Sequence, residues 1–221
     1  MDKLLKYSIG PVLLAPVIYL FIVWNSLPDT VVVHFKAGGT QDNLGSKTEL
    51  ITGVLILLAV NIVIYFLVKN IYKIDRQKNA VANKDRLNRM AFASSVYVSA
   101  IIIMTIFYSA SVGSRPFDVR FIFGTIGFMW SIFGNYIYTM KPNSFAGIRN
   151  RWTLNNKENW RKTHLLAGKL WFITGLLLTA ICLLAPQSIA VIAFIIISFS
   201  IGFIPIIYSY YIHKVKRNNH E

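Results

Sequence analysis

The chain has 221 residues, of which 55% are hydrophobic and only 14% charged, and its mean hydropathy is +0.51. Soluble domains carry about 25% charged residues, so this balance excludes an ordinary soluble domain and indicates an integral membrane protein. A net charge of +14 is typical of some nucleic-acid-binding proteins. Here the basic residues lie in short segments between apolar runs, so we expect no direct contact with nucleic acid. The single cysteine, Cys182, excludes an intrachain disulfide.

Six apolar segments follow one another, each close to the ~20 residues that a helix needs to cross a bilayer. Helices are expected because lipid cannot satisfy free backbone groups and because no alternating barrel pattern occurs in the sequence. The sequence therefore predicts an all-α, polytopic integral membrane protein with six transmembrane helices. The predicted spans cover approximately residues 7–26, 50–68, 91–111, 121–140, 166–185 and 189–212.

The Lys and Arg residues divide unequally between the two sides of the predicted bundle. Nineteen of the 23 fall in the N-terminus, the 69–89 and 141–169 segments and the C-terminal tail, which share one side. Cytoplasmic loops carry the excess of Lys and Arg, so both termini are predicted to be cytoplasmic. The predicted location is the bacterial cytoplasmic membrane, with membrane lipid as a partner.

The N-terminal region, residues 1–70, is predicted to hold two spans that flank an external loop at 27–49. The first apolar run follows Lys3 and Lys6, as in a signal peptide, but no small-x-small cleavage pattern follows it. We therefore expect an uncleaved first span.

The external loop combines an extended stretch with turn residues. TVVVHF, residues 30–35, is typical of a strand because of its β-branched residues, whereas AGGTQDNLGS, residues 37–46, favours turns. His34 and Asp42 fit a metal or a polar ligand, but no recognised metal-ligand spacing is present in the sequence, and we expect no metal. A structured turn with His34 hydrogen-bonded and a recognition site both remain open. The candidate recognition residues are His34, Gly38, Asp42, Ser46 and Lys47.

A basic cytoplasmic loop is predicted at 71–90, and residues 91–221 are predicted to form a four-helix membrane region. The fourth span contains a strip of small residues that suits close packing of helices. Its members are Gly124, Gly127, Ser131 and Gly134.

Polar residues are rare in the middle of the predicted spans. No span carries Asp, Glu, Lys, Arg or His near its centre, which disfavours ion-coupled transport. Asn61 and Asn135 are the main polar residues at mid-span, and we expect each to make one interhelical hydrogen bond. Passage of a neutral solute along these groups remains an alternative function.

The basic segment at 141–169 leads directly into the fifth span. Asn155 with Glu158 three residues later predicts a capping box, so a helix is expected to begin near Asn156 and continue into the span. On this helix Trp160, His164 and Ala167 share one side by their spacing.

The charges of this segment fit two interpretations. As an interface anchor, Lys162 and Lys169 would reach lipid phosphates. As a site, Arg149 and Arg151 would pair with Glu158, with lipid phosphate or with an acidic partner. The sequence contains no nucleophile–base arrangement, paired carboxylates, Cys/His cluster or phosphate loop, so we expect neither enzymatic activity nor a cofactor. A membrane enzyme that uses His34 and Asp42 is the weakest alternative.

The order of residues in the basic segment resembles the signature of SdpI-type bacterial membrane proteins. The resemblance runs through Gly147-Ile148-Arg149, Trp152-Thr153-Leu154, Glu158, Trp160, Lys162-Thr163-His164 and Gly168. The external loop resembles an N-terminal domain of unknown function often joined to that family, through Leu27-Pro28, His34-Phe35, Gly38, Asp42 and Gly45-Ser46-Lys47. This chain departs from the usual family patterns at HFKAGGTQDN and at Asn150.

The resemblance implies an integral membrane immunity protein that gives resistance to a secreted antimicrobial peptide toxin and also signals to a cytoplasmic regulator. The implied partners are the toxin at the external face and the regulator at the basic segment. The residues that it marks in the cytoplasmic signature are Gly147, Arg149, Trp152, Thr153, Glu158, Trp160, Lys162, Thr163, His164 and Gly168. A facilitator for a small solute is the alternative.

Overall fold

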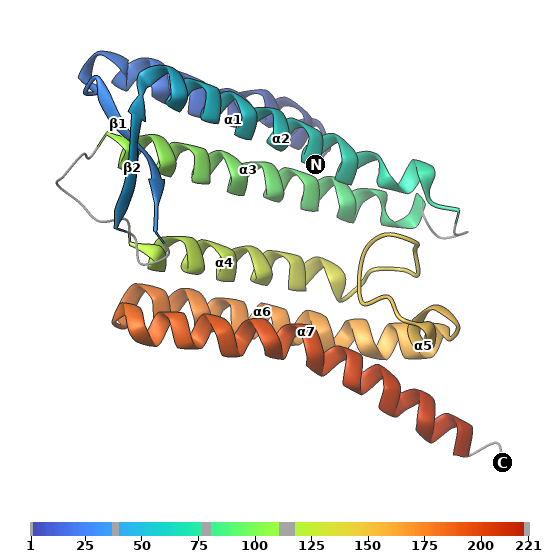
Figure 1. Cartoon of the computed structure of the whole chain (residues 1–221). Coiled ribbons are helices and arrows are strands. Elements are labelled where there is room, and N and C mark those ends of the chain that lie inside the picture. The colour runs from blue at the N-terminus through green and yellow to red at the C-terminus, as the bar shows by residue number, and fades with distance from the viewer. Residues whose placement is uncertain (1, 37–39, 77–80, 111–117, 219–221) are drawn as a thin grey trace. The chain divides into compact units, whose positions relative to one another are not determined.

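A computed structural model describes residues 2–36, 40–76, 81–110 and 118–218 (Figure 1). The chain is 81% helical with one small sheet, which confirms the all-α prediction. It divides into two compact units, residues 1–68 with 91–122 and residues 69–90 with 123–221, and each is described by itself. The predicted division at residues 70 and 90 follows the sequence pattern and stays a prediction.

The elements in chain order are α1 Asp2–Val23, η1 Trp24–Ser26, β1 Thr30–Phe35, β2 Gln41–Ser46, α2 Lys47–Ile74, η2 Val81–Asn83, α3 Lys84–Ser109, α4 Val119–Ile137, α5 Arg151–Leu154, α6 Lys157–Leu184 and α7 Gln187–Asn218.

Five helical segments of the described chain are long and apolar enough to cross a membrane. They correspond to the first, second, third, fifth and sixth predicted spans. The fourth predicted span is helical as α4 but is not among the five, because Arg120 and Asn135 lower the hydropathy of a short helix. The chain is a multi-pass membrane protein, while the count of six spans and the sides of the termini stay predictions.

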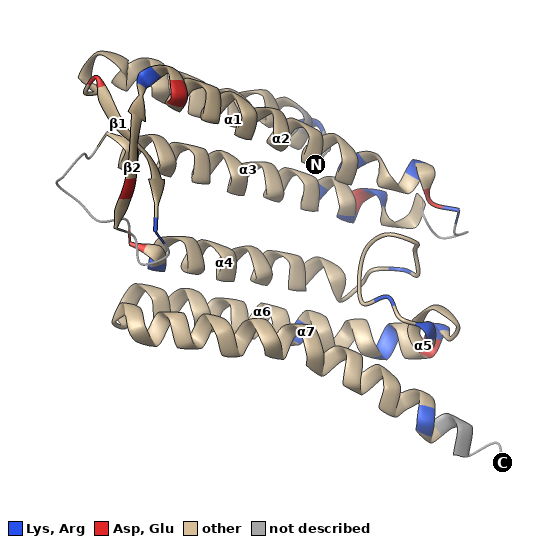
Figure 2. Cartoon of the chain, in the orientation of Figure 1, with Lys and Arg blue, Asp and Glu red and all other residues tan. Residues whose placement is uncertain are grey.

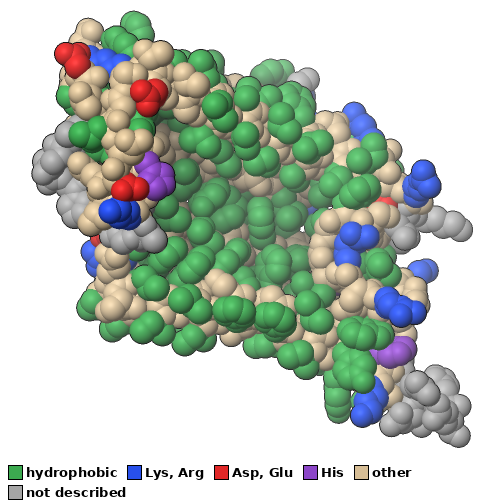
Figure 3. Space-filling view, viewed as in Figure 1, with side chains coloured by type: hydrophobic (Ala, Val, Ile, Leu, Met, Phe, Trp, Pro, Cys, Tyr) green, Lys and Arg blue, Asp and Glu red, His purple; other side chains and the backbone are tan. Residues whose placement is uncertain are grey.

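The surface pattern agrees with membrane insertion. In each unit, hydrophobic side chains cover the face seen in Figure 3, and Lys and Arg gather toward the helix ends (Figure 2). Large apolar side chains such as Phe21 and Leu184 are almost fully exposed. Exposed apolar surface on this scale is unusual in a soluble monomer and fits contact with lipid.

The first unit holds α1, most of α2 and most of α3 around a core that includes Leu20, Val31, Val54 and Ile106. Buried Asn61 on α2 donates to the Ser95 carbonyl (3.2 Å) and to Ser99 Oγ (3.0 Å), and accepts from Ser95 Oγ (2.8 Å). The interhelical hydrogen bond predicted for Asn61 is therefore confirmed.

The loop between α1 and α2 forms an antiparallel hairpin, β1–β2. Val31 and Val32 of β1 are buried, which confirms the strand predicted at 30–35. Residues 41–46, predicted as turns, are instead strand β2, which pairs from Thr30↔Ser46 to Phe35↔Gln41 with irregular register near His34. Asp, Asn and Gly are poor strand formers, so pairing with β1 rather than local preference places β2 in the sheet.

The second unit packs α4 closely on α6 through small residues. Gly127 and Gly134 of α4 lie against the backbone of α6, and Ser131 donates to the Phe172 carbonyl at 3.1 Å. The predicted small-residue packing strip is confirmed. Asn135, in contrast, is exposed, and within the described residues it does not form the interhelical hydrogen bond expected of it.

Gly134→Ala should lower the free energy of unfolding by about 1–3 kcal/mol, because this packing leaves no room for a methyl group. An added Cβ would lie 2.6 Å from the Phe172 nitrogen and 2.7 Å from the Gly168 oxygen, both backbone atoms. Gly202→Ala is the matched control, since a Cβ there meets nothing within 4 Å. Denaturant unfolding of the purified protein in detergent measures both; equal stability of the two variants would contradict this packing.

Candidate functional site

The hairpin brings two of the predicted recognition residues together. His34 Nδ1 lies 3.1 Å from Asp42 Oδ2, and Lys36 Nζ lies 3.4 Å from Asp42 Oδ1. All three side chains are exposed. Gly38, also predicted here, lies outside the described residues. The result is a small polar surface on the hairpin, defined by His34, Lys36 and Asp42.

Ser46 and Lys47 lie at the other end of β2 and stabilise the start of α2. Ser46 Oγ accepts from the Glu49 N–H (3.3 Å), and Glu49 Oε1 accepts from the Ser46 N–H and hydroxyl (3.2 Å each). This is a capping box, a feature that the spacing of Ser46 and Glu49 in SKTE indicates but that was not among the predictions. Lys47 pairs with Asp29 at 3.6 Å and lies 5.6 Å from the Trp24 ring centre. These two residues therefore have structural partners apart from the polar surface of the hairpin.

His164 is the centre of the cytoplasmic signature. It is fully buried, and its Nε2 accepts a hydrogen bond from the Ile148 N–H at 3.1 Å. Since Nε2 is an acceptor, Nδ1 carries the proton and donates to the Trp160 carbonyl at 2.8 Å. The geometry selects the neutral Nδ1–H tautomer. A protonated ring would lose the Ile148 bond.

Gly147 is required where the 141–150 turn meets His164. Its φ of +109° lies in a region that favours glycine, and an added Cβ would overlap His164 Nε2. The Trp160 ring stacks on the His164 ring, with 4.0 Å between the ring centres. Trp160 Nε1 also donates to the Met140 carbonyl at 2.8 Å. Two buried rings of α6 thus bind both ends of the turn.

Helix caps complete this local structure. Asn150 caps α5 in a capping box with Thr153, whose buried hydroxyl also donates to the Ile148 carbonyl at 2.8 Å. The predicted cap at Asn155 is wrong: Asn156 caps α6 by accepting from the N–H groups of Glu158 and Asn159. Asn155 is instead the C-cap of α5, a short helix that the sequence analysis did not predict.

A second polar chain links α6 to α7. Buried Asn159 donates to the Ser209 carbonyl at 2.8 Å and accepts from Thr163 Oγ1 at 3.0 Å, while Asn150 donates to Ser209 Oγ. Thr163 is among the predicted signature residues, whereas Asn159 and Ser209 are not. The four-residue spacing of Asn159 and Thr163, which places both on one helix face, was the available signal. We call His164, Trp160, Thr153, Asn159 and Ser209, with their partners, the buried network.

The remaining signature residues lie at or near the surface. Arg149 is exposed, Glu158 pairs with Lys162 one turn later at 2.9 Å, and Trp152 packs on Tyr210 at 5.0 Å between ring centres. Gly168 is buried, and a side chain there would overlap Tyr138, which directly follows α4. The signature thus contains a buried part and an exposed charged part.

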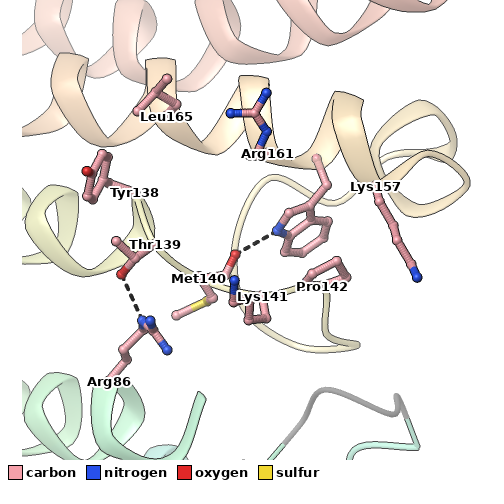
Figure 4. Close-up of a pocket in the computed structure, with 10 residues that line it drawn as sticks. Arg86, Tyr138, Thr139, Met140, Lys141, Pro142, Lys157, Arg161 and Leu165 are labelled. Atoms are coloured by element: carbon pink, nitrogen blue, oxygen red, sulfur yellow. Dashed lines mark hydrogen bonds between the residues drawn. The ribbon is translucent and has the colours of Figure 1, made fainter. Parts of the chain in front are cut away.

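A basic pocket of about 600 Å³ lies beside the buried network, within the second unit (Figure 4). Arg86 reaches it from the start of α3, Lys141 from the turn, and Lys157 and Arg161 from the first two turns of α6. We call it the basic pocket. This pocket could not be predicted from the sequence, because Arg86 is far along the chain from the other three cations.

Comparison with known proteins agrees with the signature. Residues 139–209 match the sequence model of the SdpI/YfhL protein family, and residues 12–66 match a domain of unknown function, DUF1648. The two matches confirm the predicted resemblance to the SdpI family and to the N-terminal domain of unknown function. No curated protein and no solved structure matches the chain significantly.

The SdpI/YfhL region contains the whole buried network, from Met140, which accepts from Trp160, to Ser209 at its last position. The basic pocket combines residues of the SdpI/YfhL region with Arg86, which precedes it. Among the described residues, no group of three or more His, Cys, Asp and Glu side chains could hold a metal ion.

Gly147→Ala should destabilise the SdpI/YfhL region by roughly 2 kcal/mol or more, because it combines backbone strain with overlap at His164. Combining it with His164→Ala removes the overlap, so the double variant should lose less stability than the sum of the two single variants. Unfolding of all four proteins in detergent gives this coupling free energy. Additive losses would contradict the contact, and Gly53→Ala, whose Cβ meets nothing within 4 Å, is the control.

Proposed function

We propose that this chain is a bacterial membrane immunity protein that protects its producer against a secreted peptide toxin. The observation that carries the proposal is the match of residues 139–209 to the SdpI/YfhL family. The toxin is proposed to meet the chain at the β1–β2 hairpin, on the side predicted to be external.

The hairpin has two properties that suit recognition of a peptide. A two-stranded sheet has open edges, whose free N–H and C=O groups can pair with an extended segment of another chain. The polar surface of His34, Lys36 and Asp42 adds charged groups of both signs beside these edges. Backbone pairing would supply affinity and the side chains would supply selectivity.

The alternative, a facilitator for a neutral solute, loses Asn61 as a residue of the expected path. The Asn61 side chain is buried and its amide makes three hydrogen bonds to Ser95 and Ser99. Its polar atoms are therefore occupied within the helix pair. The exposed Asn135 alone does not favour a solute path over the immunity proposal.

Expression of this gene in a sensitive host should raise the toxin concentration needed for killing, and His34→Ala/Asp42→Ala should reduce that protection at least tenfold. The reason is that the double variant removes the paired polar surface but no buried contact. Asp118→Ala/Arg120→Ala is the matched control: it removes an ion pair of the same unit outside the hairpin, in which the Arg120 hydrogen bond lowers the pKa of Asp118.

Immunoblots of membranes establish equal amounts of the three proteins. Equal killing with and without the gene, for every candidate peptide, would remove the immunity proposal. Equal loss of protection in both double variants would remove the hairpin as the toxin site while leaving immunity in place.

The exposed part of the signature suits contact with an acidic cytoplasmic regulator. Arg149 and Arg151 flank the N-cap of α5 and are both exposed. Charged surfaces of opposite sign speed association and select partners, so these two cations are proposed to hold the regulator.

Arg149→Glu/Arg151→Glu should abolish any toxin-dependent change in transcription from the promoter of this protein's gene. The reason is that two charges that attract an acidic regulator become charges that repel it. Protection against the toxin should persist, since the buried network is untouched. Lys73→Glu/Arg76→Glu reverses two exposed charges outside the SdpI/YfhL region and is the control. A reporter response that is the same in all three proteins would contradict this contact.

A further inference from the structure

The basic pocket has four cationic side chains in its lining and no acidic one. Arg86 is held in place, since its Nε donates to Thr139 Oγ1 and its Nη1 to the Ala82 carbonyl, both at 2.8 Å. The side chains of Lys141, Lys157 and Arg161 have no hydrogen-bond or ion-pair partner among the described residues. Three cations that lack partners, beside one oriented guanidinium, provide a binding site for an anion.

The stability of the fold does not account for these charges. Lys157 is the first residue of α6, where the helix dipole favours an acidic side chain and opposes a basic one. By contrast, Lys162 of the same helix pairs with Glu158, so its charge is balanced within the fold. The four cations of the pocket have no acidic residue beside them in the lining. A bound anion would reduce the mutual repulsion of these cations.

The pocket adjoins an apolar groove between α4 and α6. Tyr138 lines both, and the groove of about 210 Å³ continues past Gly134 and Gly168 to Phe172 and Ile173. The close approach of the two glycines leaves this groove open at the surface of the helix pair. Leu165 lines the pocket, and Lys169, one turn later on α6, lines the groove.

We propose that the basic pocket and groove bind an anionic phospholipid, with its phosphate among Arg86, Lys141, Lys157 and Arg161 and an acyl chain along Phe172 and Ile173. Basic pockets at the cytoplasmic ends of membrane helices are suited to anionic headgroups, and this one lies on the side predicted to be cytoplasmic. A soluble phosphate compound would use the same cations but leave the groove empty. The groove is therefore the reason to assign a lipid. This site is independent of the immunity proposal.

The test uses the purified full chain in detergent, and native mass spectrometry measures binding of phosphatidylglycerol, phosphatidylcholine and glycerol 3-phosphate. The pocket variant is Lys157→Gln/Arg161→Gln, which alters exposed side chains without partners among the described residues. Arg149→Gln/Arg151→Gln is the matched control, because it removes two exposed cations of the same unit outside the pocket. Thermal unfolding establishes that both variants are folded.

The expected result is preferential binding of phosphatidylglycerol over phosphatidylcholine, weakened on the order of tenfold or more in the pocket variant and unchanged in the control variant. Glycerol 3-phosphate should not bind at the same concentration. Equal binding of the two lipids, or equal loss in both variants, would overturn the proposal. Binding of glycerol 3-phosphate as tightly as phosphatidylglycerol would overturn the lipid assignment and give the pocket to a soluble phosphate compound.

Discussion

The local fold of the second unit around the 141–150 turn depends on the hydrogen bonds of the buried His164 ring. Its ring lies where water does not reach, so each ring nitrogen needs a protein partner. One nitrogen accepts from the Ile148 N–H of the preceding turn and the other donates to the Trp160 carbonyl of its own helix. The turn must therefore approach the Nε2 edge of the ring closely, which requires glycine at position 147, while Trp160 stacks on a face of the ring. His164 thus positions the end of this turn at residues 147 and 148, while Trp160 holds its start at Met140 and Asp75 holds Ser144.

This arrangement separates scaffold from surface within a single signature. The buried signature residues make internal hydrogen bonds and packing contacts, as Trp160, Thr163 and His164 do. Thr153 completes the capping box of α5. The cations between them in sequence point elsewhere, because residues one or two positions apart on a helix face different directions. Of these cations, Arg161 lines the basic pocket and Lys162 pairs with Glu158. The buried residues of the signature therefore hold the local fold together, and only its exposed cations are proposed to bind partners.

Helices and their buried faces could be predicted from the sequence because they follow from local periodicity. The burial of Trp160, His164 and Ala167 is an example, as is the strand TVVVHF. Features that depend on distant partners could not be predicted. β2 exists because β1 pairs with it, and the partner of His164 is a backbone amide that has no sequence signature. The choice of Asn156 over Asn155 as cap depends on α5, whose last turn Asn155 completes.

Helix α2 joins the hairpin directly to the second unit. This helix begins at the Ser46 capping box beside β2, and it enters the second unit at Lys69. Directly after it, Asp75 accepts from the Ser144 N–H at 2.9 Å, within the turn that precedes His164. A ligand at the hairpin would alter this turn through α2 if it bound one of two arrangements of the helix more tightly, since binding both equally shifts nothing. Immunity needs only the binding, whereas signalling needs the difference in affinity. The two functions are therefore separable in principle, and variants at either end of α2 would be expected to divide them.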